Sequence, residues 1–275
     1  EATYKQSIID AISRPAERVM TWSTYQDIFL TKARVEQGKA FEQQYRDSFD
    51  RAEAKWGVDR WIILAILGVE TSYGRIKGRY RVIDALSTLA FDYPPRSGFF
   101  RKELRELFLL AREQQKPVAG LVGSYAGAMG YGQFIPSSYR AYAVDFNDDA
   151  FIDIWNEPVD AIASIANYLA VHGWQKNGPI LVPMTSKAAL PIDFFNQQLK
   201  PALSAEKLTE AGIALNESLL DWPALKAAPL RYEGKAGVET WLGFQNFYSI
   251  TRYNRSRLYA MAVFQLSQRL KAAAS

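Results

Sequence analysis

The spacing of apolar residues along the chain predicts a mainly helical protein. Residues 1–57 are polar and charged with scattered aromatic side chains, as in amphipathic helices that lie on a core. From Asp59, a suitable N-cap, the segment DRWIILAILGVE is apolar on all sides, which predicts a short helix enclosed at the centre of the fold. Residues 101–115 have helical apolar spacing, and a further helix is expected to begin near Pro158 and to stop at Gly173.

The pattern changes between Asn177 and about Gln245, where short segments punctuated by proline look partly like strands. We expect a small α+β insertion here, followed by an amphipathic helix that packs back on the core. The predicted fold class is therefore mainly α. The expected boundaries are 1–58 for an N-terminal helical region, 59–176 for the core, 177–246 for the insertion and 247–275 for the C-terminal helix.

Composition narrows the classes of function. With 275 residues, 48% of them hydrophobic, the chain can bury a full-sized core. A net charge of +4 comes from dispersed basic residues without a recognised nucleic-acid motif, so no nucleic-acid partner is expected. The absence of cysteine excludes disulfides, thiol catalysis and cysteine metal sites. The longest apolar run, Trp61 to Val69, is far shorter than the roughly 20 residues that span a bilayer, so no transmembrane segment is expected.

Glu70 is the first candidate for chemistry, because it ends this apolar run directly before the turn-like residues 71–74. In the last turn of a helix the macrodipole is negative and apolar neighbours exclude solvent, and both effects disfavour the charged carboxylate. A glutamate that keeps its proton near neutral pH can act as a general acid. The alternative is a structural ion pair with Arg75 or Arg79, which on local sequence alone is the commoner arrangement.

A second candidate is the segment 123–146, which combines closely spaced glycines with aromatic residues. Glycine lets the backbone approach a ligand, and aromatic faces stack on sugar rings or bases. The order G127-x-x-G130-x-G132 does not match a dinucleotide-binding or phosphate-binding loop. The residue two before Ser124 is Val122, where a serine-hydrolase elbow needs glycine, and the only histidine, His172, is expected to cap a helix end.

The third candidate is an acidic loop, DFNDDAFIDIWNEPVD, at residues 145–160. Ala150 stands where glycine normally makes the sharp turn of a calcium loop, and Asn156 stands where glutamate normally closes it. Positive φ at this alanine would cost on the order of 1 kcal/mol, so we expect a structural calcium or sodium site of reduced affinity. The alternative is an acidic turn held by hydrogen bonds to its own backbone. The oxygen donors at positions 1, 3, 5 and 7 of the loop are Asp145, Asn147, Asp149 and the carbonyl of Phe151.

Five blocks of sequence resemble the membrane-bound lytic transglycosylase B type of bacterial murein enzymes. In chain order they are ETSYG, ALSTLAFDYPPRSGFF, GSYAGAMGYGQFIPSSYRAYAVDF, WNEPVDAIASIANYLAVHGW and FYSITRYNRSRLYAMAVFQL. The resemblance implies a lysozyme-like helical core that cleaves the β-1,4 bond between N-acetylmuramic acid and N-acetylglucosamine. The muramic acid's own C6 hydroxyl attacks its anomeric carbon, N-acetylglucosamine leaves, and a 1,6-anhydro ring is formed. Glu70 matches the family's single acid and base, and no cofactor is needed because the substrate supplies the nucleophile.

The resemblance also assigns binding residues by position. Ser124 and Gln133 match groups that hydrogen-bond the substrate near the cleaved bond. Arg96 matches a basic residue that meets a peptide stem or a glycan carboxylate, although Pro95 replaces a second arginine common in the family. Asp160 would close the calcium loop. The aromatic and amide walls of the cleft correspond to Tyr25, Tyr168, Tyr253, Asn254 and Tyr259, and for Tyr25, Tyr168 and Tyr259 core packing is the alternative.

The expected partners are peptidoglycan glycan strands and proteins of cell-wall synthesis or remodelling, and the enzyme is expected to be a periplasmic monomer. Because the chain begins with Glu rather than Met, we expect that a targeting segment was removed, and a lipidated N-terminus at the outer membrane is one form of this. Two other functions stay open. One is a muramidase that uses water, and the other is a non-catalytic module that binds peptidoglycan or chitin, against which an intact Glu70 argues.

Overall fold

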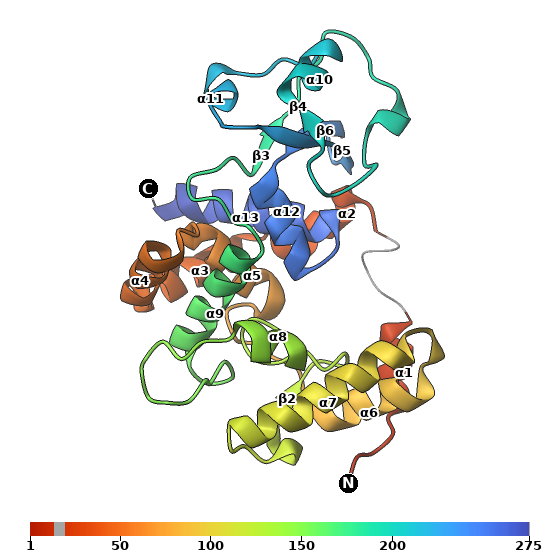
Figure 1. Cartoon of the computed structure of the whole chain (residues 1–275), viewed down its shortest axis with the longest axis vertical. Helices are drawn as coiled ribbons and strands as arrows, with labels where there is room; N and C mark the ends of the chain where they lie inside the picture. The colour runs from red at the N-terminus through yellow and green to blue at the C-terminus, as the bar shows by residue number, and fades with distance from the viewer. Residues whose placement is uncertain (14–19, 275) are drawn as a thin grey trace.

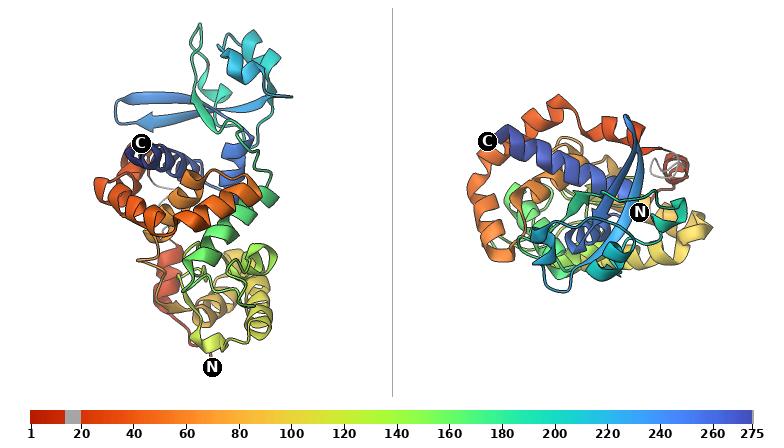
Figure 2. Two further views of the ribbon diagram at one scale, coloured as in Figure 1. Left: turned by 90° about the vertical axis from the view of Figure 1, so that its left-hand side faces the viewer. Right: turned by 90° about the horizontal axis from the view of Figure 1, so that it is seen from above.

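The helices of the protein form a tall molecule with a small sheet at one end (Figures 1 and 2). A computed structural model describes residues 1–13 and 20–274. The helices are α1 (Gln6–Ile12), α2 (Trp22–Phe29), α3 (Lys32–Gln44), α4 (Arg46–Trp56), α5 (Arg60–Thr71), α6 (Val82–Asp92), α7 (Ser97–Glu113), α8 (Pro136–Tyr142), α9 (Pro158–Val171), α10 (Ala205–Glu210), α11 (Glu217–Leu220), α12 (Gln245–Tyr253) and α13 (Arg257–Ala274). The strands are β1 (Tyr80–Arg81), β2 (Val122–Gly123), β3 (Leu181–Pro183), β4 (Leu203–Ser204), β5 (Lys226–Gly234) and β6 (Gly237–Gly243). The prediction of a mainly α fold is confirmed.

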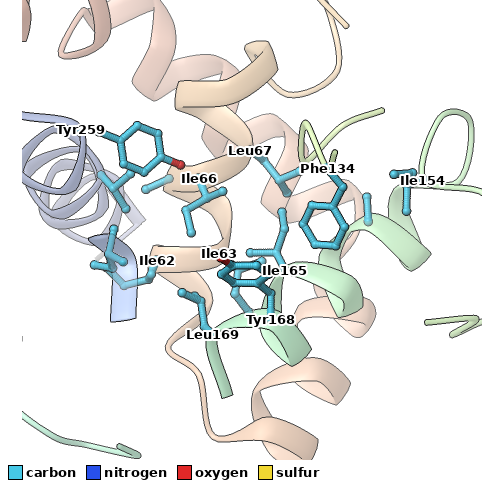
Figure 3. Close-up of a cluster of buried hydrophobic side chains, with 14 of the residues drawn as sticks. Ile62, Ile63, Ile66, Leu67, Phe134, Ile154, Ile165, Tyr168, Leu169 and Tyr259 are labelled. Atoms are coloured by element: carbon cyan, nitrogen blue, oxygen red, sulfur yellow. The ribbon is translucent and has the colours of Figure 1, made fainter. Parts of the chain in front are cut away.

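Helix α5 is the centre of the core, as its apolar sequence predicts. The carboxylate of Asp59 accepts a 2.7 Å hydrogen bond from the backbone N–H of Trp61 and so caps the helix. Every residue from Ile62 to Gly68 is buried. The helix lies between α9 on one side and α13 on the other (Figure 3). Because each fully buried Ile or Leu contributes about 1.5–3 kcal/mol, this packing fixes the direction in which the helix end points.

Helices α6 and α7 form an antiparallel pair at the opposite end from the sheet, and α1 packs on α6 (Figure 1). The N-terminal segment is tied to α6 by two hydrogen bonds to side chains. The backbone N–H of Thr3 donates to Asp84 at 2.8 Å, and that of Lys5 donates to Thr88 at 3.1 Å. The start of the chain is therefore part of this end of the molecule.

The sheet is antiparallel, with strand order β3-β6-β5-β4, and β5 and β6 form a hairpin that closes at Gly234 and Gly237. Alternate residues of β5 point in opposite directions, as the pleat requires. Leu230 and Tyr232 belong to the main core, and the Tyr232 ring meets that of Trp22 on α2 at 6.0 Å. Other residues of the sheet belong to a second, smaller core with α10 and α11. The sheet is thus attached to the helical core through α2.

The end of the chain forms two helices where the sequence pattern predicts one. Helix α12 ends at Tyr253, and Asn254 is extended with φ −138° and ψ 124°. The hydroxyl of Ser256 then accepts a 3.2 Å hydrogen bond from the N–H of Tyr259 and starts α13. The break lets α13 run back along α5. Among the helices that the structure describes, none combines the length and the apolar character needed to cross a bilayer.

Candidate active site

Glu70 is the last residue but one of α5, in a partly exposed position at the end of the buried helix. The helix stops because Ser72 and Tyr73 adopt left-handed φ values of 50° and 60°. The hydroxyl of Thr71 accepts a 2.9 Å hydrogen bond from the N–H of Gly74 and lies 2.9 Å from the carbonyl oxygen of Tyr131. The turn behind Glu70 is therefore tied to the glycine-rich segment.

Tyr259 is a hydrogen-bond partner of Glu70. Its hydroxyl donates a 2.6 Å hydrogen bond to Oε1 of the carboxylate. Tyr259 is only 2% exposed. Burial, together with the negative charge of Glu70, raises the pKa of Tyr259 well above its usual value. The hydroxyl therefore keeps its proton near neutral pH and remains a donor to Glu70.

Tyr253 is a second tyrosine under the influence of the same carboxylate. Its hydroxyl donates a 2.5 Å hydrogen bond to the carbonyl oxygen of Gly132. Burial, followed by the charges of Glu70 and Tyr168, raises the pKa of Tyr253 well above its usual value. The structure thus brings the end of α5, the end of α12, the start of α13 and the glycine-rich segment to one place.

The other predicted aromatic residues lie at different depths. Tyr168 packs against Tyr253 with ring centres 4.8 Å apart, and its hydroxyl donates at 2.6 Å to the carbonyl oxygen of Arg252. The side chain of Tyr168 is 8% exposed, whereas those of Tyr25 and Tyr259 are each 2% exposed. The rings of Tyr25 and Tyr259 therefore pack in the core, and only their edges can reach a ligand.

Ser124 and Gln133 organise the glycine-rich segment from within. The Ser124 hydroxyl accepts hydrogen bonds from the N–H groups of Ala126 and Ala128 at 3.2 and 3.1 Å. The Gln133 amide nitrogen donates to the carbonyl oxygens of Gly130 at 2.9 Å and Lys77 at 3.3 Å. A hydroxyl that already accepts two bonds still has its own proton to donate, and the Gln133 amide still has its oxygen to accept with.

Arg96 and Asn254 line one groove of about 830 Å³. The short helical turn Pro94–Arg96 before α7 forms one side of it. The other sides are the first residues of α2, the loop 196–199, strand β5 and the start of α13. Leu258, which lines this groove, directly precedes Tyr259. The groove therefore begins beside the partner of Glu70.

The acidic loop 145–160 is closed by hydrogen bonds between carboxylates and the backbone. Asp145 accepts from the N–H groups of Asp148 and Ala150, and Asp160 accepts from those of Phe146 and Asp153, each at 2.8 Å. Burial raises the pKa of Asp160, the two N–H bonds oppose this, and the charges of Asp145 and Asp149 raise it further. Asp160 has no exposed surface.

These placements test whether a calcium ion fits the loop. Ala150 adopts φ 73°, in the left-handed region that its position in the motif predicts. Asn147 donates to Asp149 at 3.2 Å, and both oxygens of Asp160 are engaged by backbone. In the described part of the chain, no three His, Cys, Asp or Glu side chains lie close enough together to hold a metal ion. The acidic members of the predicted donor set are thus not gathered around one point, and the metal site, which also includes the Phe151 carbonyl, stays a prediction.

Two lysines hold this loop in a way that no sequence motif indicates. The ammonium of Lys116 forms a 2.9 Å ion pair with Asp153. The ammonium of Lys77 donates at 2.6 Å to the carbonyl oxygen of Trp155 and lies 4.5 Å from the ring centre of Tyr131. Because both contacts join residues that are far apart in the chain, only the folded structure reveals them.

Known proteins resemble the chain in sequence and in structure. The family model described as Transglycosylase SLT domain matches residues 1–268. Membrane-bound lytic murein transglycosylase B of Escherichia coli (strain K12) is 43% identical over 264 residues, which are 96% of this chain and 71% of that protein.

Solved structures agree with these matches. Soluble lytic transglycosylase SltB1 from Pseudomonas aeruginosa superposes with a TM-score of 0.93 at 48% identity, covering 100% of this chain and 91% of that one. The Escherichia coli lytic transglycosylase Slt35 in complex with calcium gives 0.89 at 41% identity, covering 99% and 85%. SltB3 from Pseudomonas aeruginosa in complex with NAG-anhNAM-pentapeptide gives 0.81 at 30% identity, covering 98% and 72%.

Proposed function

This chain belongs to the transglycosylase SLT domain family, and on that premise we propose that a single residue, Glu70, supplies both the acid and the base of its reaction. The chain is a peptidoglycan lytic transglycosylase of lysozyme-like fold, which confirms the resemblance seen in the sequence. The observation that carries the proposal is the 2.6 Å hydrogen bond from Tyr259 to Oε1 of Glu70. In this proposal Oε1 accepts from Tyr259 and Oε2 carries the proton that the reaction needs.

In the first step, Oε2 of Glu70 gives its proton to the oxygen of the β-1,4 bond. The bond from this oxygen to the anomeric carbon of muramic acid breaks, and N-acetylglucosamine leaves with the proton. The positive charge that develops is shared by the ring oxygen and the 2-acetamido group of the substrate. The resulting Glu70 carboxylate is stabilised by the Tyr259 hydroxyl, because a hydrogen bond to a charged acceptor is about twice as strong as one to a neutral acceptor.

In the second step, the C6 hydroxyl of the same muramic acid forms a bond to its anomeric carbon. Its proton passes to the Glu70 carboxylate, which returns to the protonated state. No water is consumed, and the product is a 1,6-anhydro ring. A second carboxylate is not required, because the nucleophile comes from the substrate.

The remaining predicted residues bind the glycan in this proposal. Ser124 donates its free proton and Gln133 accepts with its amide oxygen near the cleaved bond. Tyr168 and Tyr253 form the aromatic wall, and Asn254 and Arg96 extend it along the groove that they line. Tyr25 and Tyr259, buried to all but 2%, act through their hydroxyl edges.

The proposal locates the enzyme in the periplasm, because peptidoglycan lies there and the Escherichia coli relative is named membrane-bound. Partners other than glycan strands, a lipid anchor and a monomeric state stay predictions. The calcium complex of the relative Slt35 raises the question of an ion in the loop 145–160. Since no three His, Cys, Asp or Glu side chains of the described residues are gathered there, we infer that the loop closes without an ion.

The test is the mass of the products released from purified peptidoglycan by the wild-type chain and by Glu70→Gln. The wild type should release anhydro products, and Glu70→Gln should bind glycan but lose turnover by several orders of magnitude. Glu103→Gln is the matched control, since Glu103 is a glutamate buried elsewhere, at 4% exposure, and accepts a hydrogen bond from Ser137 on α8. Substantial cleavage by Glu70→Gln would refute the role of Glu70. Products heavier by one water would identify a muramidase instead.

A further inference from the structure

The side chain of Gln133 is held in one orientation by two backbone carbonyl groups. Its amide nitrogen donates to the carbonyl oxygens of Gly130 at 2.9 Å and Lys77 at 3.3 Å. A carbonyl oxygen can only accept, so the amide nitrogen must face these two groups and the amide oxygen must face away from them. One of the two carbonyls belongs to a residue that lies 56 positions earlier in the chain. The direction of the amide oxygen therefore depends on where the Lys77 carbonyl is held.

The side chain of Lys77 is fixed at its far end. Its ammonium donates a 2.6 Å hydrogen bond to the carbonyl oxygen of Trp155 and lies 4.5 Å from the ring centre of Tyr131. Lys77 is half-buried, so water competes less with these two contacts than it would at an exposed site. Tyr131 is itself fixed, since its N–H donates at 2.9 Å to the carbonyl oxygen of Ile154. The contacts thereby hold a flexible lysine in one conformation.

The peptide group that carries the Lys77 carbonyl also runs close to strand β2. Gly78, the next residue, has φ 91°, and a Cβ built on it would lie 2.1 Å from the carbonyl oxygen of Gly123. The indole N–H of Trp155 donates at 3.0 Å to the carbonyl oxygen of Val122 in the same strand. The Lys77 carbonyl is therefore fixed from two sides, by strand β2 and by the acidic loop to which Trp155 belongs.

We propose that Lys77 is a positioning residue for the reaction. Its ammonium, bound to the Trp155 carbonyl, holds its own backbone carbonyl at the place where the Gln133 amide needs it. The inference rests on the proposed function, in which the Gln133 oxygen accepts a hydrogen bond from the glycan. Lys77 acts through Gln133 and not on the glycan itself. The acidic loop thus takes part in substrate binding through one lysine.

Lys116 separates this role from simple support of the loop. Its ammonium pairs with Asp153 at 2.9 Å and lies 5.5 Å from the ring centre of Trp155. It therefore holds the same loop as Lys77 does. Within residues 1–13 and 20–274, however, no hydrogen bond joins Lys116 to Gln133. If support of the loop were all that mattered, loss of either ammonium would have the same effect on the reaction.

The experiment is a double-mutant cycle between residues 77 and 133, measured as kcat/KM for release of anhydro products from glycan strands. Lys77→Met keeps a long side chain over the Tyr131 ring and removes the ammonium. It should lower kcat/KM about tenfold in the wild type, but less than twofold in Gln133→Ala, where no amide is left to position. Lys77→Arg restores a charged donor and should recover part of the loss. Lys116→Met is the matched control and should change kcat/KM less than twofold in both backgrounds.

Binding measured in the Glu70→Gln background gives a readout that does not depend on turnover. There Lys77→Met should weaken the binding of glycan strands about tenfold, and Lys116→Met should leave it unchanged. Equal losses from the two methionine variants would overturn the inference. So would a loss from Lys77→Met that is as large in Gln133→Ala as in the wild type.

Failure of the proposed function would look different from failure of this inference. If Gln133→Ala binds and cleaves glycan like the wild type, the binding role of Gln133 is refuted, and the inference falls with it. If Gln133→Ala weakens binding and Lys77→Met does not, the inference alone is wrong. If the wild type releases no anhydro product, the proposed reaction itself is wrong.

Discussion

The hydroxyl of Tyr259 donates a 2.6 Å hydrogen bond to Oε1 of Glu70, although the two residues are 189 positions apart in the chain. The bond joins the start of α13 to the end of α5. Because the donor arrives with the last helix, the site is complete only when α13 has docked on the core. The raised pKa of Tyr259 keeps this donor protonated, whether the glutamate is an acid or a carboxylate.

Tyr259→Phe should lower turnover by about 10- to 100-fold and leave the fold intact. The ring stays in its buried place, and only the hydroxyl that stabilises the Glu70 carboxylate is lost. A hydrogen bond to a charged group contributes about 1.5–3 kcal/mol, which sets this range. The measurement is kcat for release of anhydro products, with circular dichroism as the check on folding.

Tyr139→Phe is the matched control for this variant. Tyr139 is also 2% exposed, and its hydroxyl donates at 2.6 Å to the carbonyl oxygen of Ile152, away from Glu70. It should lose a similar amount of stability and keep its turnover. Equal kcat values for the two variants would show that the bond to Glu70 has no part in the reaction.

His172, the only histidine, should titrate below its usual pKa of 6.5. Burial lowers its pKa, the hydrogen bond to the Tyr168 carbonyl at 2.7 Å opposes this, and the charge of Arg252 lowers it again. The ring also stacks on that of Tyr168, with centres 4.0 Å apart. The titration of the single imidazole by NMR measures this directly, and a midpoint at or above 6.5 would contradict the prediction.

The same shift gives a sign for the pH dependence of stability. Well above pH 6.5 the imidazole is neutral in both the folded and the unfolded state and adds no pH dependence. As the pH falls from 6.5 through the lower pKa of the folded protein, the unfolded chain takes up the proton first, so stability is lost. Urea unfolding at pH 7.5 and pH 5.5 should therefore show a smaller loss for His172→Gln than for the wild type.

Some of this site is readable from sequence because the signals are local. The apolar run after Asp59 predicts α5, and the turn residues after Glu70 predict where the helix ends, which the structure places at Thr71. Hydrophobic spacing and capping act over a few residues, so they are visible in the sequence itself. His172 likewise stands at the C-cap of α9, where its neighbour Gly173 predicts a helix end.

The features that the sequence does not reveal all depend on packing between distant segments. Three features join parts of the chain with no shared local pattern: the bond from Tyr259 to Glu70, the groove lined by Arg96 and Asn254, and the contacts of two lysines with the acidic loop. The acidic loop shows a different limit. Asp and Asn at alternate positions suit both a metal ion and hydrogen bonds to their own backbone, and spacing alone does not separate the two.

Calcium should leave the melting temperature of the protein unchanged within about 1 °C. A site filled to 100 times its Kd would add about 2.7 kcal/mol, which is roughly 5–10 °C for a chain of this size. No three His, Cys, Asp or Glu side chains of the described residues are gathered in the loop 145–160, so we expect no such gain. The measurement is thermal unfolding in EDTA and in millimolar calcium, and a rise of several degrees would restore the metal site.

Two variants distinguish a loop that is closed by hydrogen bonds to its own backbone from a loop that is closed by a bound ion. Asp160→Asn removes a buried acceptor of two N–H groups and should cost about 2 kcal/mol with or without calcium. Asp149→Asn is the control, because Asp149 is exposed and accepts one backbone bond, from Phe151 at 2.9 Å, and one from the exposed Asn147 side chain at 3.2 Å. It should change stability by less than about 0.5 kcal/mol. If both variants lost stability only in the presence of calcium, a loop closed by a bound ion would be favoured.

The turn behind Glu70 depends on a glycine that is crowded by an aromatic ring. Gly74 has φ 84°, and a Cβ built on it would lie 1.9 Å from Cε1 of Tyr131. Its N–H also donates to the hydroxyl of Thr71 at 2.9 Å. Any larger residue must therefore adopt a strained backbone conformation and push away the Tyr131 ring that packs on the turn.

Gly74→Ala should destabilise the protein by about 3 kcal/mol, since positive φ costs about 1 kcal/mol and overpacking typically adds 1–3 kcal/mol. The melting temperature should fall by roughly 5–10 °C. Gly98→Ala is the matched control, and its effect on stability should have the opposite sign. Gly98 lies in α7 with nothing within 4 Å of its Cβ position, so alanine there should stabilise the helix by up to about 1 kcal/mol.

Because the altered turn directly follows Glu70, Gly74→Ala should also lower kcat at a temperature where it is fully folded. A variant with unchanged kcat there would show that the carboxylate is held by α5 and Tyr259 alone.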